Sequence, residues 1–208
     1  MGLFPRAGPG AGLTWSADNF QLKVSIMHPA VLTLDHAGLP SHWATWEATV
    51  VAKVKGLIAW HAGSEFEVLG GRSRATGLRT MITVPTIVSL KGQRFNGRVP
   101  LTNHALFQRD AYICCYCGQQ FSRSRLTREH IIPVSRGGKN TWLNCATCCE
   151  ACNQAKKNLL PEEAGMRLVY VPYEPNVAES LLLSGRNIIS DQMEFLTRHV
   201  KHAVRPLG

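Results

Sequence analysis

Seven cysteines lie between Cys114 and Cys152, and the rest of the 208-residue chain contains none. Cysteine thiolates can bind metals, form disulfides or act as nucleophiles, and their spacing helps to separate these roles. A disulfide framework is unexpected, because the number is odd and the thiols are clustered rather than spread along a small secreted domain. The cluster therefore predicts a metal site.

Two Cys-x-x-Cys pairs can supply the four sulfur ligands that a closed tetrahedral zinc site needs. Cys114 and Cys117 form the first pair and precede Gly118, a residue that tolerates the tight backbone turn of such a pair. The preferred second pair is Cys149 with Cys152. These four thiols are the predicted ligands of a structural zinc ion.

Cys145 and Cys148 have the same spacing and are an alternative second pair. We prefer the later pair because the sequence around it, EACNQAKKNLL, predicts the start of a helix. Zinc thiolates at such a position gain from the positive end of the helix dipole. With this choice, Cys115, Cys145 and Cys148 are buried or free thiols.

Residues 118–148 separate the two pairs and form a longer spacer than that of a simple zinc ribbon. The spacer holds Glu129 and His130, which open the strand-like run EHIIP, and also Asn144. Adjacent side chains of a strand point to opposite faces, so this carboxylate and this imidazole are expected to have separate roles. Asn153 directly follows the last cysteine.

From about Leu106 to Leu168 the chain resembles the HNH endonuclease family in its four-cysteine, zinc-stapled form. The resemblance rests on RDAYICCYCG, LTREHIIPVSRGG, the W-x-N motif that ends at Asn144, the CxxCN motif that ends at Asn153, and PEEAGMRL. It implies a ββα-metal fold, in which two antiparallel strands and a helix surround one divalent cation.

The resemblance also implies roles for single residues. His130 would be the general base, a role for which histidine is well suited at neutral pH. Glu129 and Asn153 would bind the catalytic metal, and Asn144 would hold the loop so that His130 faces the scissile phosphate. Two residues depart from the family pattern: Asn153 stands in place of the last histidine, and Glu129 is one methylene longer than aspartate.

Phosphodiester hydrolysis builds negative charge on phosphate oxygens, which a hard divalent cation can stabilise. Oxygen ligands select Mg²⁺ or Mn²⁺, whereas four thiolates select Zn²⁺. We therefore expect two metals with different tasks: zinc folds the segment, and Mg²⁺ or Mn²⁺ takes part in catalysis. The resemblance implies products with 3′-hydroxyl and 5′-phosphate ends.

The charge distribution favours a polyanionic partner. The chain carries a net charge of +9, and residues 108–160 hold eight basic and three acidic residues, a net charge of +5. Such an excess is typical of binding to a nucleic-acid backbone, and we expect double-stranded DNA to be the partner. The candidate phosphate contacts are Arg128, Arg136, Lys139, Lys156 and Lys157.

The expected fold class is α+β. We expect a loose tail (1–22), a small α+β unit of unassigned role (23–100), the HNH nuclease domain (101–168) and a C-terminal extension with a helix (169–208). Predicted strands lie at 30–35, 57–63, 66–71 and 80–92, and predicted helices at 43–54, 98–110 and 189–200. In the last predicted strand, Pro85 indicates either an edge strand or a bulge.

Composition excludes several other classes. Apolar residues make up 45% and charged residues 18% of the chain, which argues against general disorder. The longest uncharged apolar stretch, Thr80–Leu90, is too short to cross a bilayer. The first twenty residues lack the apolar run of a secretory signal, so a cytoplasmic protein without membrane contact is expected.

Two other functions compete with the endonuclease. A zinc-stabilised module could bind nucleic acid without cutting it, and a zinc-braced domain could bind other proteins. The combination of Glu129, His130 and Asn153 favours the enzyme, because a pure binding module does not need it. The basic excess disfavours the protein-binding domain.

Overall fold

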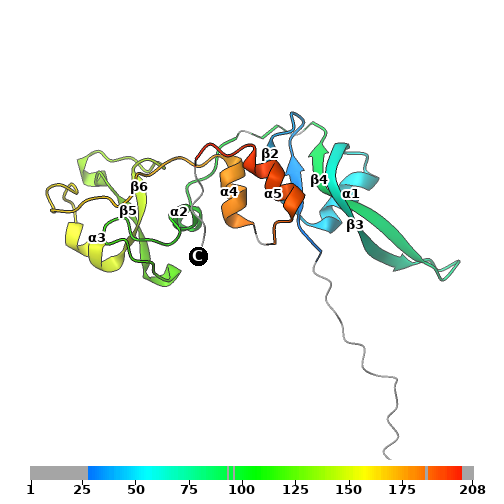
Figure 1. The fold of residues 1–208 in the computed structure, drawn as a ribbon, viewed down its shortest axis with the longest axis horizontal. Coiled ribbons are helices and arrows are strands. Elements are labelled where there is room, and N and C mark those ends of the chain that lie inside the picture. The colour runs from blue at the N-terminus through cyan, green and yellow to red at the C-terminus, as the bar shows by residue number, and fades with distance from the viewer. Residues whose placement is uncertain (1–27, 93, 96, 186, 203–208) are drawn as a thin grey trace, which may run out of the picture.

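The computed structural model describes residues 28–92, 94–95, 97–185 and 187–202. The predicted tail at 1–22 lies outside these residues. Figure 1 shows an elongated molecule with a sheet unit at one end and a small ββα module at the other, and with helices between them. None of the helices in the described ranges has the length and apolar composition needed to span a bilayer.

The sheet unit contains four strands in the order β2-β1-β4-β3. These strands are β1 (Val31–Leu34), β2 (Pro40–Ala44), β3 (Ile58–Arg72) and β4 (Arg79–Leu90). β1 pairs with β4 in parallel, and the other neighbours are antiparallel. β3 and β4 are much longer than β1 and β2, so their far ends pair only with each other.

Helices cover both faces of this sheet. Val31 faces a core with side chains from α1 (Trp46–Val54), whereas its neighbour Leu32 faces α4 (Val177–Ser184) and α5 (Ser190–Thr197). This alternation is the two-residue period of a strand. The C-terminal helices thus complete the core of a sheet formed by the N-terminal half of the chain, although the sequence analysis treated the two segments separately.

Three predictions for the sheet unit need correction. The helix predicted at 43–54 begins at Trp46, because Thr45 caps it and the preceding residues pair with β1 as β2. The strands predicted at 57–63 and 66–71 are one continuous strand, β3. β4 is a central strand rather than an edge strand, and the strand register shifts next to Pro85, as the alternative of a bulge predicted.

Two of the helices that connect the two units begin at capping residues that can be recognised in the sequence. α2 (Asn103–Arg109) is capped by Thr102, which confirms the predicted helix, and α5 confirms the C-terminal one. α4 was not predicted, although Asn176 and Glu179 form a capping box at its start. The segment 166–173 contains no regular secondary structure.

The ββα module consists of β5 (Leu126–His130), β6 (Cys145–Cys149) and α3 (Glu150–Lys156). The strands are antiparallel and the helix follows directly, in the order expected for a ββα-metal fold. Glu129 and His130 stand at the end of β5, not at the start of a strand as predicted. Pro133 follows closely, and proline cannot continue a strand ladder.

A buried arginine anchors this module to α2. The guanidinium of Arg109 is fully buried and forms a two-point ion pair with Asp110 at 2.8 and 3.0 Å. It also donates to the backbone carbonyls of Trp142, Cys145 and Tyr173. All five of its N–H donors are therefore satisfied within the protein, so Arg109 is a structural residue rather than a phosphate contact.

Candidate functional site

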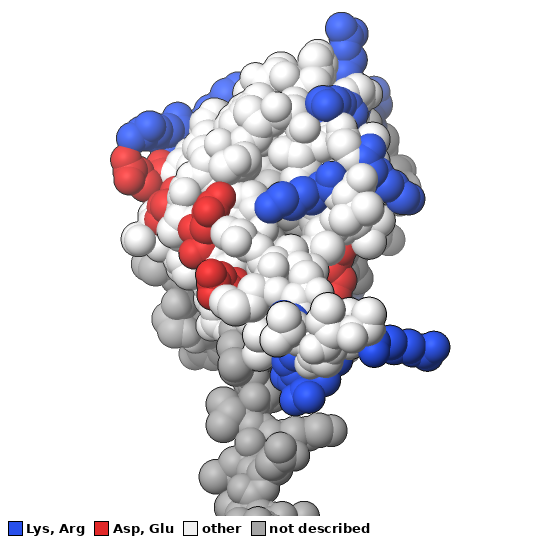
Figure 2. Space-filling view, turned by 90° about the vertical axis from the view of Figure 1, so that its right-hand side faces the viewer, with Lys and Arg blue, Asp and Glu red and all other residues white. Residues whose placement is uncertain are grey.

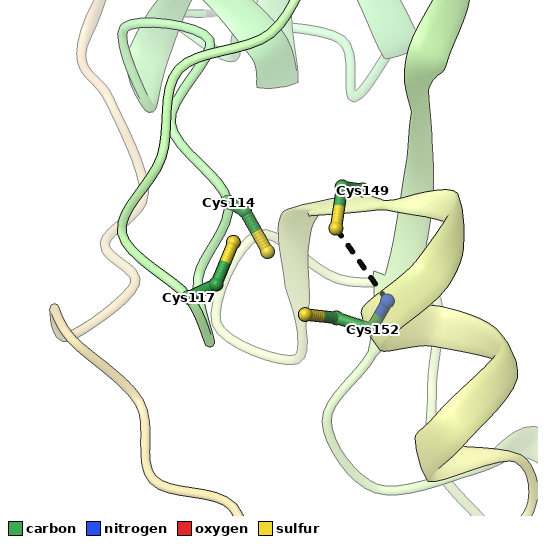
Figure 3. A group of neighbouring side chains, drawn as sticks. All are labelled: Cys114, Cys117, Cys149 and Cys152. Atoms are coloured by element: carbon green, nitrogen blue, oxygen red, sulfur yellow. Dashed lines mark hydrogen bonds between the residues drawn. The ribbon is translucent and has the colours of Figure 1, made fainter.

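Four cysteines from two segments meet at one point (Figure 3). The sulfur atoms of Cys114, Cys117, Cys149 and Cys152 all lie within 4.8 Å of one another, which suits a single bound metal ion. The first two come from the turn before β5, and the other two come from the start of α3. The structure thus brings together the preferred pairs and leaves Cys145 outside the group.

Local structure explains this convergence. Gly118 has a φ of +70° and donates to the carbonyl of Cys114, which closes the first Cys-x-x-Cys turn. Cys149 is the N-cap of α3, and its sulfur accepts a hydrogen bond from the backbone N–H of Cys152. Burial raises the pKa of Cys114, but backbone N–H groups of neighbouring residues outweigh it and lower this pKa to about 6. Cys114 therefore favours the thiolate, the form that binds metals, whereas burial raises the pKa of Cys117 and of Cys152.

The remaining cysteines belong to the core of the module. Cys115 and Cys148 are fully buried among small and aromatic side chains, and Cys145 packs against α2. Cys148 approaches Cys114 with a sulfur–sulfur distance of 3.9 Å but is not a member of the four-thiol group. These three thiols are buried, as expected for cysteines that do not bind the metal.

Glu129 and His130 point to opposite sides of β5, as the alternation of strand side chains requires. Glu129 is 4% exposed and faces α3, where it forms an ion pair with Lys156 at 2.6 Å. His130 is half-buried and faces the loop between the two strands, where its Nε2 lies 3.3 Å from Oδ1 of Asn140. The carboxylate and the imidazole therefore lie on different sides of the strand.

Lys156 is not available for phosphate contact, which corrects the prediction from sequence. Its side chain is 1% exposed, and its ammonium group contacts both the Glu129 carboxylate and the carbonyl oxygen of His130. Lysine rarely lies this deep unless it is paired. Its position on the inner face of α3, three residues after Asn153, determines this burial.

Asn153 lies in the same strand–helix interface as Glu129. Its Nδ2 donates a 2.8 Å hydrogen bond to Oγ1 of Thr127, which is on the same face of β5 as Glu129. Both contacts of Glu129, from Lys156 and from the Tyr116 hydroxyl, go to Oε1. Among the described residues nothing donates to Glu129 Oε2 or to Asn153 Oδ1, so one carboxylate oxygen and one amide oxygen remain as potential cation ligands.

Asn140 is a residue that the sequence analysis missed. Its Oδ1 accepts a 2.8 Å hydrogen bond from Arg128, and since arginine only donates, this bond identifies the oxygen. The contact with His130 Nε2 therefore requires a proton on Nε2, which leaves Nδ1 as the basic nitrogen. Asn140 has no sequence signal except its place among polar residues before the W-x-N motif.

Asn144 closes the loop between the strands. Its Oδ1 accepts from the backbone N–H of Ile132, and its Nδ2 donates to the carbonyls of Ile132 and Lys139. These three bonds connect the two ends of the loop that follows His130. The loop approaches itself most closely at Gly138, where an added Cβ would lie 1.7 Å from the carbonyl oxygen of Ile132.

Replacing Gly138 with alanine is expected to displace this loop, because the atom that the new methyl group meets belongs to the backbone. We expect a loss of about 1–3 kcal/mol in the free energy of unfolding, measured by urea denaturation. Gly71→Ala is the matched control, since its Cβ would meet nothing within 4 Å. Equal stability of the two variants would contradict the close approach at Gly138.

The other predicted phosphate contacts differ in their exposure and in their hydrogen-bond or ion-pair partners. Lys139 and Lys157 are exposed, and Arg136 is exposed but paired with Glu163 at 2.7 Å. Arg128 is half-buried and held by Asn140 and the carbonyl of Leu101. The two buried ion pairs cancel internally, so the net excess of +5 over residues 108–160 belongs to the outer side chains.

Two antiparallel strands, a following helix and four converging thiols define a ββα module with a cysteine metal site. Residues 114–169, which begin at the first of these thiols, match the model of the HNH endonuclease family. The match indicates nuclease-type chemistry on a nucleic-acid substrate for this segment. Among curated proteins, none matches the chain.

Proposed function

We propose that the protein is a metal-dependent endonuclease that hydrolyses phosphodiester bonds of double-stranded DNA, with His130 as the general base. The proposal depends on one observation: at the end of β5 the side chains of Glu129 and His130 point to opposite sides of the strand. Glu129 faces α3 beside Asn153, while His130 faces outward to Asn140. A pure binding module would not need an imidazole and oxygen donors arranged in this way.

In the proposed reaction, Nδ1 of His130 takes a proton from a water molecule. The water oxygen then bonds to phosphorus, and the bond between phosphorus and the 3′ oxygen breaks. The departing 3′ oxygen takes a proton from solvent water, which leaves 3′-hydroxyl and 5′-phosphate ends. Asn140 holds the imidazole through Nε2, and Asn144 holds the loop that lies beside it. Both are positioning residues, because they act through His130 and not on the phosphate.

Glu129 and Asn153 would hold the divalent cation. Their available oxygens are a carboxylate and a carboxamide, the hard donors that Mg²⁺ and Mn²⁺ prefer. When bound, the cation stabilises the negative charge that develops on the phosphate oxygens. The four thiolates would hold Zn²⁺ instead, as a structural ion. Exposed Lys139 and Lys157, together with Arg136 and Arg128, are the proposed phosphate contacts of the domain.

One observation favours a second candidate, a zinc-stabilised module that binds nucleic acid without cutting it. The 2.6 Å ion pair with Lys156 already neutralises the charge of Glu129. If this pair persists in the presence of divalent cations, Glu129 gains little from binding one. The two candidates therefore differ in whether cations reach Glu129.

Cleavage of supercoiled plasmid tests the proposal. Protein that retains its tightly bound zinc is freed of loosely bound metal and incubated with Mg²⁺, Mn²⁺ or neither. We expect nicked or linear DNA with the added cations only, and ends that DNA ligase can rejoin. Binding without cleavage under every cation would support the silent module.

A carboxylate variant makes this test specific to the site. Glu129→Gln should abolish cation-stimulated cleavage, whereas Glu150→Gln, an exposed change on the same helix as Lys156, should not. Glu129→Gln alone leaves a buried ammonium group unpaired, which costs ~3–5 kcal/mol. Glu129→Gln/Lys156→Met removes both charges, so it should restore stability but not cleavage. Cleavage by the double variant would exclude Glu129 as a cation ligand.

A further inference from the structure

The far ends of β3 and β4 form a two-stranded ribbon that extends away from the rest of the molecule. We call residues 69–81 the ribbon arm. All side chains at 71–81 are exposed, and no other strand pairs with this part of β3 or β4. Figure 1 shows the arm at the end of the molecule opposite the ββα module. Because the exposed side chains of the arm do not pack in the core, they are available to bind a partner.

The tip of the arm has a defined backbone. The N–H of Ser73 donates to the carbonyl of Leu78 at 2.8 Å, and the N–H of Gly77 donates to the carbonyl of Ser73 at 2.9 Å. Gly77 has a φ of +68°, a conformation that glycine adopts without strain. The turn therefore presents its side chains from a hydrogen-bonded framework.

The charge of the arm is entirely positive. It carries Arg72, Arg74 and Arg79, and residues 68–109 contain seven lysines and arginines but no aspartate or glutamate. Arg72 lies directly opposite Arg79 in the ribbon, a like-charge pair that destabilises a sheet. None of the three arginines forms an ion pair or a side-chain hydrogen bond within the described part of the chain.

Figure 2 shows this end of the molecule face-on. Most acidic side chains lie together on the left of the view, while basic side chains project at the top, on the right and below. Large apolar side chains accompany the arginines on the arm. Leu69 and Met81 form a cross-strand pair and are 57% and 58% exposed, and Leu78 is 71% exposed. Arginines interspersed with exposed apolar groups suit a ligand that is both anionic and apolar.

We propose that the ribbon arm binds duplex DNA in its major groove, as a second contact of the nuclease with the DNA beside the cut. This inference rests on the proposed function, since it assumes that the substrate is nucleic acid. The arginines would neutralise phosphates, and the apolar side chains would contact thymine methyl groups or the groove wall.

The shape of the arm selects between nucleic acids. Two paired strands lie about 4.8 Å apart, and with their side chains they fit the major groove of B-DNA, which is about 12 Å wide. The minor groove, about 6 Å wide, is too narrow for such a ribbon. The major groove of an RNA duplex is deep and narrow, so side chains cannot read it. The arm therefore favours duplex DNA over duplex RNA.

Binding to a 30-base-pair DNA duplex tests the arm without interference from cleavage when every protein carries His130→Ala. Arg72→Ala/Arg74→Ala/Arg79→Ala in this background should weaken binding by about tenfold or more, and the slope of log affinity against log salt should fall by about 2–3. The variant should keep its melting temperature, because all three side chains are exposed and make no ion pair with the residues that the structure describes.

Two controls separate charge from shape. Arg72→Lys/Arg74→Lys/Arg79→Lys should keep the salt slope, since the charge is retained. A duplex RNA of the same sequence should bind more weakly than DNA, and the alanine substitutions should change its affinity little. Leu78→Ser/Met81→Ser should weaken DNA binding without changing the salt slope.

Unchanged DNA affinity and salt slope in the alanine variant would overturn the proposal. The same holds if those substitutions change the oligomeric state in light scattering but not DNA binding, since the arm would then dock on a second copy of the chain. Arm-dependent binding by a protein that cleaves no plasmid would contradict the nuclease and support the arm. Cleavage by a protein whose DNA affinity does not depend on the arm would support the nuclease and contradict the proposed role of the arm.

Discussion

Replacement of His130 with alanine is expected to slow DNA cleavage by about 10²–10⁴-fold, the usual contribution of a general base. The imidazole contacts Asn140 in the loop that Asn144 closes. DNA affinity should change little, because the phosphate contacts come from other side chains. Single-turnover cleavage and equilibrium binding on the same duplex measure the two quantities separately.

His104→Ala is the matched control for this variant. His104 is an exposed histidine on α2, and its loss should leave the cleavage rate unchanged. Asn140→Ala should slow cleavage less than His130→Ala does, because the base remains but loses its orienting acceptor. Equal cleavage by wild type and His130→Ala would mean that another group takes the proton or that a contaminating nuclease cuts the DNA.

Replacement of Cys149 with serine is expected to remove the structural metal and unfold the ββα module. The module has two five-residue strands and a seven-residue helix. In the cluster around the thiols the buried residues are four cysteines, Ala146 and Tyr170, and larger side chains such as Ile131 and Leu168 are only partly buried. So small a core depends on its metal, and zinc in small domains contributes ~10 kcal/mol or more of apparent binding free energy. Metal analysis should find about one zinc ion per wild-type chain and none in the variant.

Cys145→Ala and Cys148→Ala are the controls for this ligand assignment, because they replace cysteines that are not assigned as zinc ligands. Both cysteines are buried, so these changes cost packing, but neither belongs to the four-thiol group. Each variant should therefore keep its zinc. Hydrogen exchange should show β5, β6 and α3 unprotected in Cys149→Ser and protected in the two controls. Loss of zinc from Cys145→Ala and not from Cys149→Ser would reverse the ligand assignment.

The metal site could be predicted because its determinants are local. Each Cys-x-x-Cys pair is formed by one turn, and the helix after Cys149 has its own sequence signal. The separate roles of Glu129 and His130 likewise follow from the alternation of side chains in a strand. The N-cap Thr102 is a local signal for α2, and the capping box of Asn176 and Glu179 is a comparable local signal for α4.

Non-local contacts limited the other predictions. The position of β4 in the sheet depends on its pairing with β1, which lies more than forty residues earlier in the sequence. The strand around Pro85 therefore looked like an edge from its composition alone. Packing of α4 and α5 on the first sheet joins opposite ends of the described chain, and no local pattern encodes such a contact.

The amino-acid types and spacings alone predict three features. They are a four-thiol metal site, an HNH-like set of acidic, imidazole and amide residues, and a basic surface. Only the tertiary structure decided that Lys156 is buried against Glu129, that Asn140 contacts the His130 imidazole, and that three arginines project on a ribbon. The physical reason is that ligand geometry within one turn depends on neighbouring residues, whereas burial, pairing and projection depend on which distant segments pack together.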